Sequence, residues 1–256
     1  MSTQILAVAN QKGGVAKTTT VASLGAALAE QGKAVLIVDL DPQACLTFSL
    51  GIDPEDLELS VHHVLTKGVE PAEVVIRTED GVDLLPATIE LARAETELLT
   101  RTGREYVLRA ALEDLEGYDW VLLDCPPSLG VLTVAALTAA GAVLIPLQCE
   151  TLSHRGVGQL LDTVHDVRRF TNKKLAVWGV LPTLYDGRTN HSRAVLETIS
   201  ESYGLDVIEP PIPKSIRFAE APAAGRSILA TARSNRGADA YRDVAASLTS
   251  KAASKA

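Results

Sequence analysis

The chain is poor in aromatic residues, in cysteines and in long apolar segments. Phe, Trp and Tyr make up 4% of its 256 residues, so aliphatic side chains must dominate the core. No apolar run reaches the roughly 18 residues needed to span a bilayer, and the first residues lack the basic start and apolar stretch of a signal peptide. Three scattered cysteines without a CxxC pair favour a reducing compartment over a disulfide framework. We therefore expect a cytoplasmic protein.

Charge is divided unevenly along the chain. The net charge is −8, which by itself argues against a nucleic-acid partner. However, residues 1–150 contain 9 Lys/Arg and 22 Asp/Glu, whereas residues 151–256 contain 15 Lys/Arg and 10 Asp/Glu. The second part therefore carries a charge of +5, and an acidic protein of this kind can still present a local basic face.

Aliphatic runs alternate with helical patterns throughout. Such runs, buried on both faces and separated by helices, indicate an α/β fold with a mainly parallel sheet covered on both sides. We expect one domain over residues 1–250, because no linker divides the chain, and a frayed tail over 251–256. The expected strands are 5–10, 34–40, 82–86, 119–125, 142–148, 175–183 and 207–212. The expected helices are 17–31, 88–99, 104–116, 131–140, 153–170, 190–202 and 236–249.

A glycine-rich turn, NQKGGVAKTT, covers residues 10–19 between the first strand and the first helix. Glycines let the backbone approach an anion closely, and a helix N-terminus adds partial positive charge. Lys17 can reach terminal phosphates, and the hydroxyl of Thr18 is the kind of ligand that Mg²⁺ prefers. The common pattern GxxxxGK[ST] would need glycine at Gln11 and at Ala16, so the sequence predicts a variant phosphate loop.

Two further apolar runs end in acidic residues. AVLIVDLDPQ places Asp39 at a strand end and Asp41 two residues later, on the same side of the strand. DWVLLDC places Asp124 at the end of another strand. Because ligands bind at the carboxyl ends of parallel strands, these acids are expected beside the phosphate loop. A simple strand-end turn is the alternative for Asp41, since Asp-Pro is common in turns.

The loop resembles KGGxxK[TS], the variant phosphate loop of the ParA/MinD family of P-loop ATPases. The resemblance implies that Lys12 crosses a dimer interface to the phosphates of the other subunit, and that Asp41 orients the attacking water. It also implies that Thr18, Asp39 and Asp124 hold Mg²⁺ or its waters. The residues expected to contact ATP are Lys12, Gly13, Gly14, Val15, Ala16, Lys17, Thr18 and Thr19, with adenine near Pro213 and the 182–186 loop.

Further segments match the family in order, namely IPLQCE, YDGRTN, IPKSIRFAEAP and NRGADAY. Nearly the whole chain is therefore similar to the short chromosome-partitioning ParA type, often called Soj. That likeness implies an ATP-dependent homodimer that binds DNA non-specifically and is located on the nucleoid. It also implies slow ATP hydrolysis that a ParB-like partner stimulates. Arg188, Lys214 and Arg217 lie in segments similar to DNA contacts of the family. The alternative for the two arginines is a structural ion pair, with Asp186 and Glu220 near in sequence.

The sequence also departs from the family pattern, at Ala16, Ala44-Cys45, Ala135, Thr151-Leu152 and Lys214. The methyl group of Ala16 is harmless at negative φ and awkward at positive φ. Two other functions stay open. One is a MinD-like membrane-positioning ATPase, although the last helix has only a narrow apolar stripe. The other is an ATP-dependent carboxylate or amide ligase, which would need a small-molecule pocket beside the γ phosphate.

Overall fold

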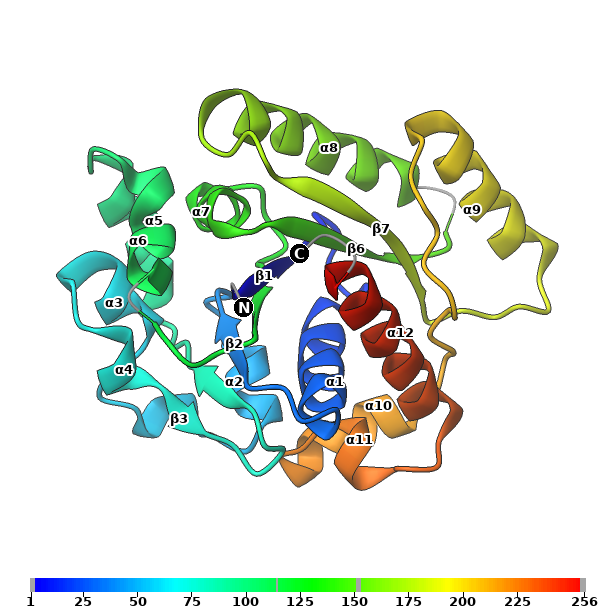
Figure 1. The fold of residues 1–256 in the computed structure, drawn as a ribbon, viewed down its shortest axis with the longest axis horizontal. Helices are drawn as coiled ribbons and strands as arrows, with labels where there is room; N and C mark the ends of the chain where they lie inside the picture. The colour runs from blue at the N-terminus through cyan, green and yellow to red at the C-terminus, as the bar shows by residue number, and fades with distance from the viewer. Residues whose placement is uncertain (1–2, 114, 151–152, 254–256) are drawn as a thin grey trace.

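A seven-stranded sheet forms the centre of the molecule (Figure 1). The computed structural model describes residues 3–113, 115–150 and 153–253. The strand order is β3-β4-β2-β5-β1-β6-β7, and every neighbouring pair is parallel except β3 with β4. The strands are β1 (Gln4–Val8), β2 (Val35–Asp39), β3 (Ile76–Arg77), β4 (Asp83–Leu85), β5 (Trp120–Asp124), β6 (Ala142–Gln148) and β7 (Ala176–Thr183).

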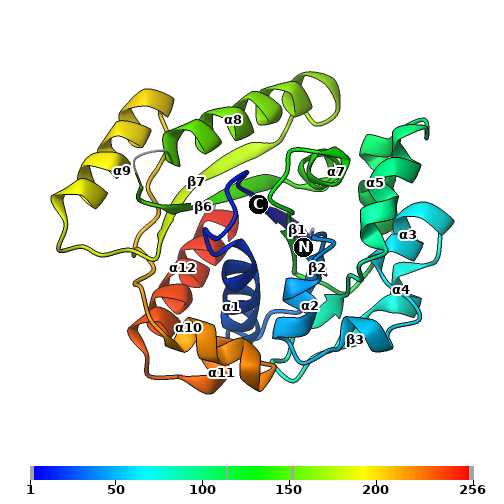
Figure 2. The ribbon, with the colours of Figure 1, turned by 180° about the vertical axis from the view of Figure 1, so that it is seen from behind.

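Helices cover both faces of the sheet, as Figures 1 and 2 show from opposite sides. One face packs against α3 (Val61–Lys67), α5 (Leu91–Leu99), α6 (Val107–Glu113), α7 (Val131–Ala139), α8 (Ser153–Phe170) and α9 (Asn190–Tyr203). The other packs against α1 (Lys17–Glu30), α2 (Cys45–Ser49), α11 (Ile228–Thr231) and α12 (Arg236–Ala253). The remaining short elements are η1 (Pro54–Asp56), α4 (Pro71–Val74), η2 (Arg104–Tyr106), α10 (Arg217–Glu220) and η3 (Ala221–Ala224).

The two-residue period of β2 divides its side chains between two cores. Leu36 and Val38 belong to the core under α5 and α7, whereas Val35 and Ile37 belong to the core under α1. All five residues of β2 are buried, as expected for a central parallel strand. Gly25 of α1 permits close packing here, because a Cβ atom on it would lie 3.0 Å from Cγ2 of Ile37.

The structure confirms the predicted fold class, a single α/β domain with a mostly parallel sheet. One predicted strand is wrong, however. Residues 207–212 form only an isolated bridge between Val207 and Val180, because Pro210, Pro211 and Pro213 lack the N–H groups that a further strand would donate. The last helix continues to Ala253, four residues beyond the expected end, and residues 254–256 lie outside the described part.

None of the described helices combines the length and the apolar character that crossing a membrane requires.

Candidate nucleotide-binding site

Buried polar side chains hold the phosphate loop between β1 and α1 against the sheet. The Asn10 side chain donates to the Pro146 carbonyl of β6 (2.8 Å) and accepts the Lys12 backbone N–H (3.0 Å). From β7, the hydroxyl of Thr183 donates to the Val15 carbonyl (3.0 Å). Nothing lies within 4 Å of a Cβ atom placed on Gly14, which has a φ of +75°. The loop is therefore fixed on the side that faces the sheet and open at Gly14, as a site for an anion requires.

Three residues other than glycine have positive φ within the described residues, and all follow strands at the carboxyl edge of the sheet. They are Ala16 (64°), Ala44 (51°) and Leu184 (49°). Ala16 immediately precedes α1, and Ala44 immediately precedes α2. Alanine is strained in this region of the backbone map. Ala16 therefore has the positive φ at which its methyl group is unfavourable, and the backbone of the site is strained.

Lys17 and Asp124 are two buried ionisable residues beneath the loop. Lys17 is 8% exposed, and its Nζ lies 3.3 Å from the Lys12 carbonyl. Burial lowers the pKa of Lys17, while the charge of Asp124 opposes that change. Asp124 is 1% exposed, and neither of its carboxylate oxygens has a well-formed hydrogen bond within the described structure, although the nearby Thr18 hydroxyl acts to lower its pKa. Burial and the neighbouring charge of Asp39 raise the pKa of Asp124 well above its usual range.

An unpartnered carboxylate at this position fits a magnesium ion. Mg²⁺ prefers hard oxygen ligands and keeps several waters, and Asp124 can supply an oxygen beside the start of α1, where Thr18 lies. A bound cation would also compensate the buried negative charges of Asp124 and Asp39, which are paired across β5 and β2. The donor set therefore suits the expected Mg²⁺, and the roles of Thr18 and Asp124 as its ligands stay a prediction.

Asp39 has a structural role that the sequence did not reveal. Its Oδ2 accepts the backbone N–H (2.9 Å) and the hydroxyl (2.8 Å) of Thr47, and its Oδ1 accepts the Asp41 N–H (3.1 Å). The Thr47 hydroxyl in turn accepts the Ala87 N–H (3.0 Å). Burial raises the pKa of Asp39 to about 6, against the lowering by the Thr47 hydrogen bonds. Asp39 thus positions Asp41 and α2, and its contact with magnesium-bound water stays a prediction.

The turn after β2 places Asp41 beside the loop. Its backbone is held by Asp39, and its Oδ1 accepts the Gln43 N–H (3.0 Å). The charge of Asp41 acts on Lys17, which places Asp41 among the charges around the phosphate loop. The side chain is half-buried, so it can reach solvent in front of the loop. This geometry permits the predicted role of Asp41 in orienting a water molecule.

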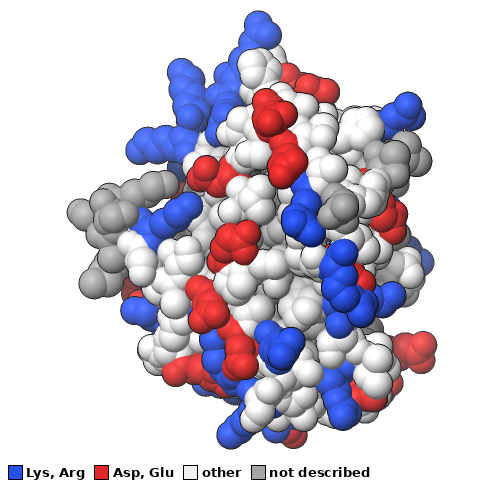
Figure 3. All heavy atoms as spheres, turned by 90° about the vertical axis from the view of Figure 1, so that its right-hand side faces the viewer, with Lys and Arg blue, Asp and Glu red and all other residues white. Residues whose placement is uncertain are grey.

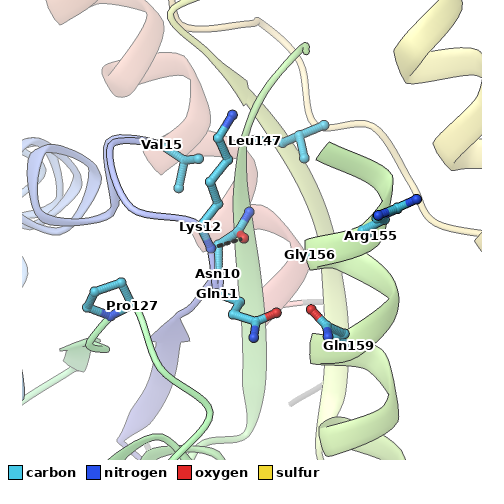
Figure 4. A pocket seen from close by; sticks show the side chains of 9 residues that line it. All are labelled: Asn10, Gln11, Lys12, Val15, Pro127, Leu147, Arg155, Gly156 and Gln159. Atoms are coloured by element: carbon cyan, nitrogen blue, oxygen red, sulfur yellow. Dashed lines mark hydrogen bonds between the residues drawn. The ribbon is translucent and has the colours of Figure 1, made fainter. Parts of the chain in front are cut away.

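Lys12 lies at the edge of the loop, where it forms an ion pair with Glu150. The sequence does not predict this partner, although Glu150 lies in IPLQCE, one of the segments similar to the family. Lys12 also lines a cavity of about 480 Å³ between the phosphate loop and α8. Figure 4 shows its side chain extending along this cavity, while the amides of Gln11 and Gln159 face each other further down. Lys12 is thus accessible to a molecule that enters from outside the subunit.

The three residues predicted to bind DNA come from neighbouring segments. Tyr185 forms a β-bridge with Pro213, which brings the 185–188 loop beside the 212–217 segment. The same bridge unites the two segments predicted to hold adenine.

Both arginines form the ion pairs that the sequence offered as the alternative. Arg188 donates to both carboxylate oxygens of Asp186 (2.9 and 2.8 Å) and lowers the pKa of Asp186 to about 2. Arg217 pairs with Glu220 at 2.7 Å. Lys214 is exposed and acts electrostatically on Asp186. Figure 3 shows the right-hand side of Figure 1, where Lys and Arg are interspersed with Asp and Glu. DNA contact by these residues stays a prediction.

These features define a class of protein. A parallel sheet, a glycine-rich loop that leads into a helix, and a buried acid at the end of the adjacent strand are the parts of a P-loop nucleotide-binding fold. The family model that matches residues 3–177 is described as an AAA domain.

Comparison with known proteins shows which family of P-loop proteins the chain resembles. The sporulation initiation inhibitor protein Soj of Bacillus subtilis is 44% identical over 244 residues, 94% of this chain and 96% of the relative. The chromosome-partitioning ATPase Soj of Thermus thermophilus is 46% identical over 240 residues, 94% of this chain and 93% of the relative. A crystal structure from Mycobacterium smegmatis, described as cobyrinic acid a,c-diamide synthase with bound ADP and magnesium, is 57% identical with a TM-score of 0.87. It covers 97% of this chain and 94% of its own. The chain belongs to the ParA/Soj family of ATPases.

Proposed function

We propose that this protein is a partitioning ATPase that binds ATP with Mg²⁺, dimerises on ATP, and binds DNA non-specifically as the dimer. The observation that carries the proposal is the set of charges around the phosphate loop. Lys17 and the unpartnered Asp124 lie buried beneath the loop, and Lys12 lies at its open edge. The two Soj relatives and the magnesium and ADP in the M. smegmatis structure support the assignment.

The residues of the chain divide the work of phosphoryl transfer between them. Backbone N–H groups of residues 13–19 would surround the phosphates, and Lys17 would neutralise charge on the terminal groups. Thr18 and Asp124 would hold Mg²⁺, which supplies positive charge at the β and γ phosphates. Asp41 would orient the water. Positioning and charge stabilisation are most of what this reaction asks of a protein.

Lys12 would couple nucleotide to dimerisation by reaching the phosphates bound in the other subunit. It must first leave Glu150, and an exposed ion pair of this kind contributes only about 0–1 kcal/mol. That small loss is readily offset by contact with a triphosphate. Hydrolysis would be slow in the isolated protein and faster with a ParB-like partner.

In the dimer, two half-patches with Arg188, Lys214 and Arg217 would join into one DNA surface. The ion pairs of Arg188 and Arg217 are exposed, so phosphate oxygens can replace Asp186 and Glu220 at little cost. Binding would depend steeply on salt, because it rests on phosphate contacts. The protein would then reside in the cytoplasm on the nucleoid.

A second candidate function is an ATP-dependent amide ligase. Two observations favour it, namely the description of the M. smegmatis structure and the cavity of about 480 Å³ beside Lys12. The partitioning function is preferred, since the Soj relatives match over nearly their whole length. Incubation with ATP, an amide donor and candidate carboxylic acids would separate the two, because a ligase forms a new amide and a partitioning ATPase forms only ADP and phosphate.

The decisive test is DNA binding with ATP, ADP or no nucleotide over a salt series. We expect ATP-dependent binding that Lys12→Ala and Arg217→Glu both abolish. Arg109→Glu is the matched control, since Arg109 also forms an exposed intrahelical ion pair, with Glu113, on α6. Equal loss in the Arg109 variant would mean that net charge alone matters. ATP-driven dimers without DNA affinity would refute the DNA part and leave the nucleotide switch in place.

A further inference from the structure

Two glycines from distant parts of the chain meet backbone to backbone. Gly51 follows α2, and Gly225 follows η3. A Cβ atom on Gly225 would lie 2.8 Å from Cα and 3.2 Å from N of Gly51, and one on Gly51 would lie 3.2 Å from the Gly225 carbonyl oxygen. The obstructing atoms are backbone, so they cannot turn aside as a flexible side chain could. The two segments therefore touch with no side chain between them.

On one side, this contact leads to the nucleotide site. Gly51 ends the segment that begins at Asp41, and the Ala44 N–H donates to the Asp41 carbonyl (2.9 Å). The Thr47 side chain ties α2 to Asp39 at the end of β2. Asp39 also accepts the Asp41 N–H, so Asp41 and α2 share one attachment, and a displacement of the segment 41–50 would carry Gly51 with it.

On the other side, the contact leads to the segment predicted to bind DNA. Gly225 is joined to α10 through η3, and its N–H donates to the Pro222 carbonyl (3.0 Å). The next residue, Arg226, donates to Asp80 (2.7 Å), and the Ser227 N–H donates to the other Asp80 oxygen (2.6 Å). The Asp80 side chain is 2% exposed. This attachment fixes the chain just after Gly225, so a push at Gly225 passes back toward α10.

We propose that the Gly51–Gly225 contact transmits the state of the nucleotide site to the segment 213–224. The movement of Asp41 and α2 on nucleotide binding shifts η3 and α10, and with them Lys214 and Arg217. In Figures 1 and 2 the chain between α10 and α11 passes beside α2, on the side of the sheet that α1 covers. The link to DNA affinity rests on the proposed function, whereas the mechanical link between the two segments does not.

The test is hydrogen exchange of the full-length protein, with and without a non-hydrolysable ATP analogue and magnesium, in the wild type and in Gly225→Ala. We expect the analogue to protect both the start of α1 and residues 217–226 in the wild type. In Gly225→Ala, protection at α1 stays within about twofold of the wild type, while the nucleotide-dependent change at 217–226 falls at least about fivefold.

Gly204→Ala is the matched control. Gly204 has nearly the same φ as Gly225 (62° against 64°), but nothing lies within 4 Å of its added Cβ atom. It therefore reproduces the backbone strain without the obstruction, and it should behave as the wild type at 217–226. For Gly51→Ala, the corresponding control is Gly32→Ala, with φ values of 81° and 77° and open space at Gly32.

Three outcomes overturn the proposal: no nucleotide-dependent change at 217–226 in the wild type, an unchanged response in Gly225→Ala, or an equal loss in Gly204→Ala. DNA affinity, measured in parallel, separates this proposal from the proposed function. A transmitted change at 217–226 in a protein that does not bind DNA supports the contact and refutes the DNA function. Loss of the ATP-to-ADP affinity ratio in Gly225→Ala alone supports both.

Discussion

The charged side chains of the nucleotide site are buried, whereas those of the predicted DNA surface are exposed. Around the phosphate loop, Asp39 and Asp124 are almost completely buried and Lys17 is 8% exposed. At the outer edge, the side chain of Arg188 is 89% exposed and that of Arg217 is 57% exposed. Burial penalises an uncompensated charge heavily, whereas exposed ion pairs contribute little. The inner site therefore favours a ligand that brings countercharge, and the outer pairs can exchange partners.

Asp124→Asn, which removes a buried carboxylate, is expected to have the largest effect. The amide keeps the shape but cannot hold Mg²⁺ as a carboxylate does, so we expect ATP hydrolysis to fall at least about 100-fold. The nucleotide-free protein should become more stable by about 1–3 kcal/mol, because an uncompensated buried charge is removed. Phosphate release measures the hydrolysis rate and thermal unfolding without nucleotide measures the stability, with exposed Asp243→Asn as the control for both. A less stable apo variant would contradict the electrostatic account.

The pH dependence of stability tests Asp39. Its pKa is raised to about 6 in the fold, so the native state binds more protons than the unfolded state between about pH 4 and 6. The nucleotide-free protein should therefore lose stability as the pH rises through this range, on the order of 2 kcal/mol from Asp39. Urea unfolding at several pH values measures the slope. Asp39→Asn should flatten it, and a slope that stays as steep would exclude Asp39 as its source.

The sequence predicted which residues lie around the phosphate loop better than it predicted the segments outside it, for a physical reason. Lys17, Asp41 and Asp124 follow central parallel strands or their turns, and buried strands bring such ends together whatever the details of packing. The structural role of Asp39 could not be foreseen, because Thr47 reaches it only through the short helix α2. The pair Lys12–Glu150 likewise joins residues 138 positions apart, and nothing in either local sequence indicates the other.

Outside the site, the errors came from short or proline-rich segments. The strand expected at 207–212 failed because of its prolines, although its apolar pattern suited a strand. The helices α10 and α11 have four residues each, too few to show a helical period. The contact between Gly51 and Gly225 depends on these short segments, so sequence patterns alone did not reveal it.

Backbone strain also distinguishes the nucleotide site from the rest of the described structure. Ala16 and Ala44 both occupy the left-handed region, where alanine is disfavoured by roughly 1–2 kcal/mol. Replacing either alanine with glycine removes this strain, but part of the gain in stability is lost because glycine makes the unfolded chain more flexible. We therefore expect Ala16→Gly and Ala44→Gly each to stabilise the protein by about 0.5–1 kcal/mol. In Ala29→Gly, within α1, the sign should reverse. Destabilisation by all three glycines in urea unfolding would refute the strain.

The smallest effect is expected at the exposed edge. Arg188→Ala removes a bidentate ion pair with Asp186, yet the free energy of unfolding should stay almost unchanged, because both partners are solvated. Urea unfolding at low and high salt measures it, with Arg109→Ala on α6 as the control, because Arg109 also forms an ion pair at the surface, with Glu113. DNA affinity should fall several-fold in the Arg188 variant alone. A large loss of stability would instead make the Arg188 pair a structural one, and the exposed edge would then resemble the buried site in depending on its own charges.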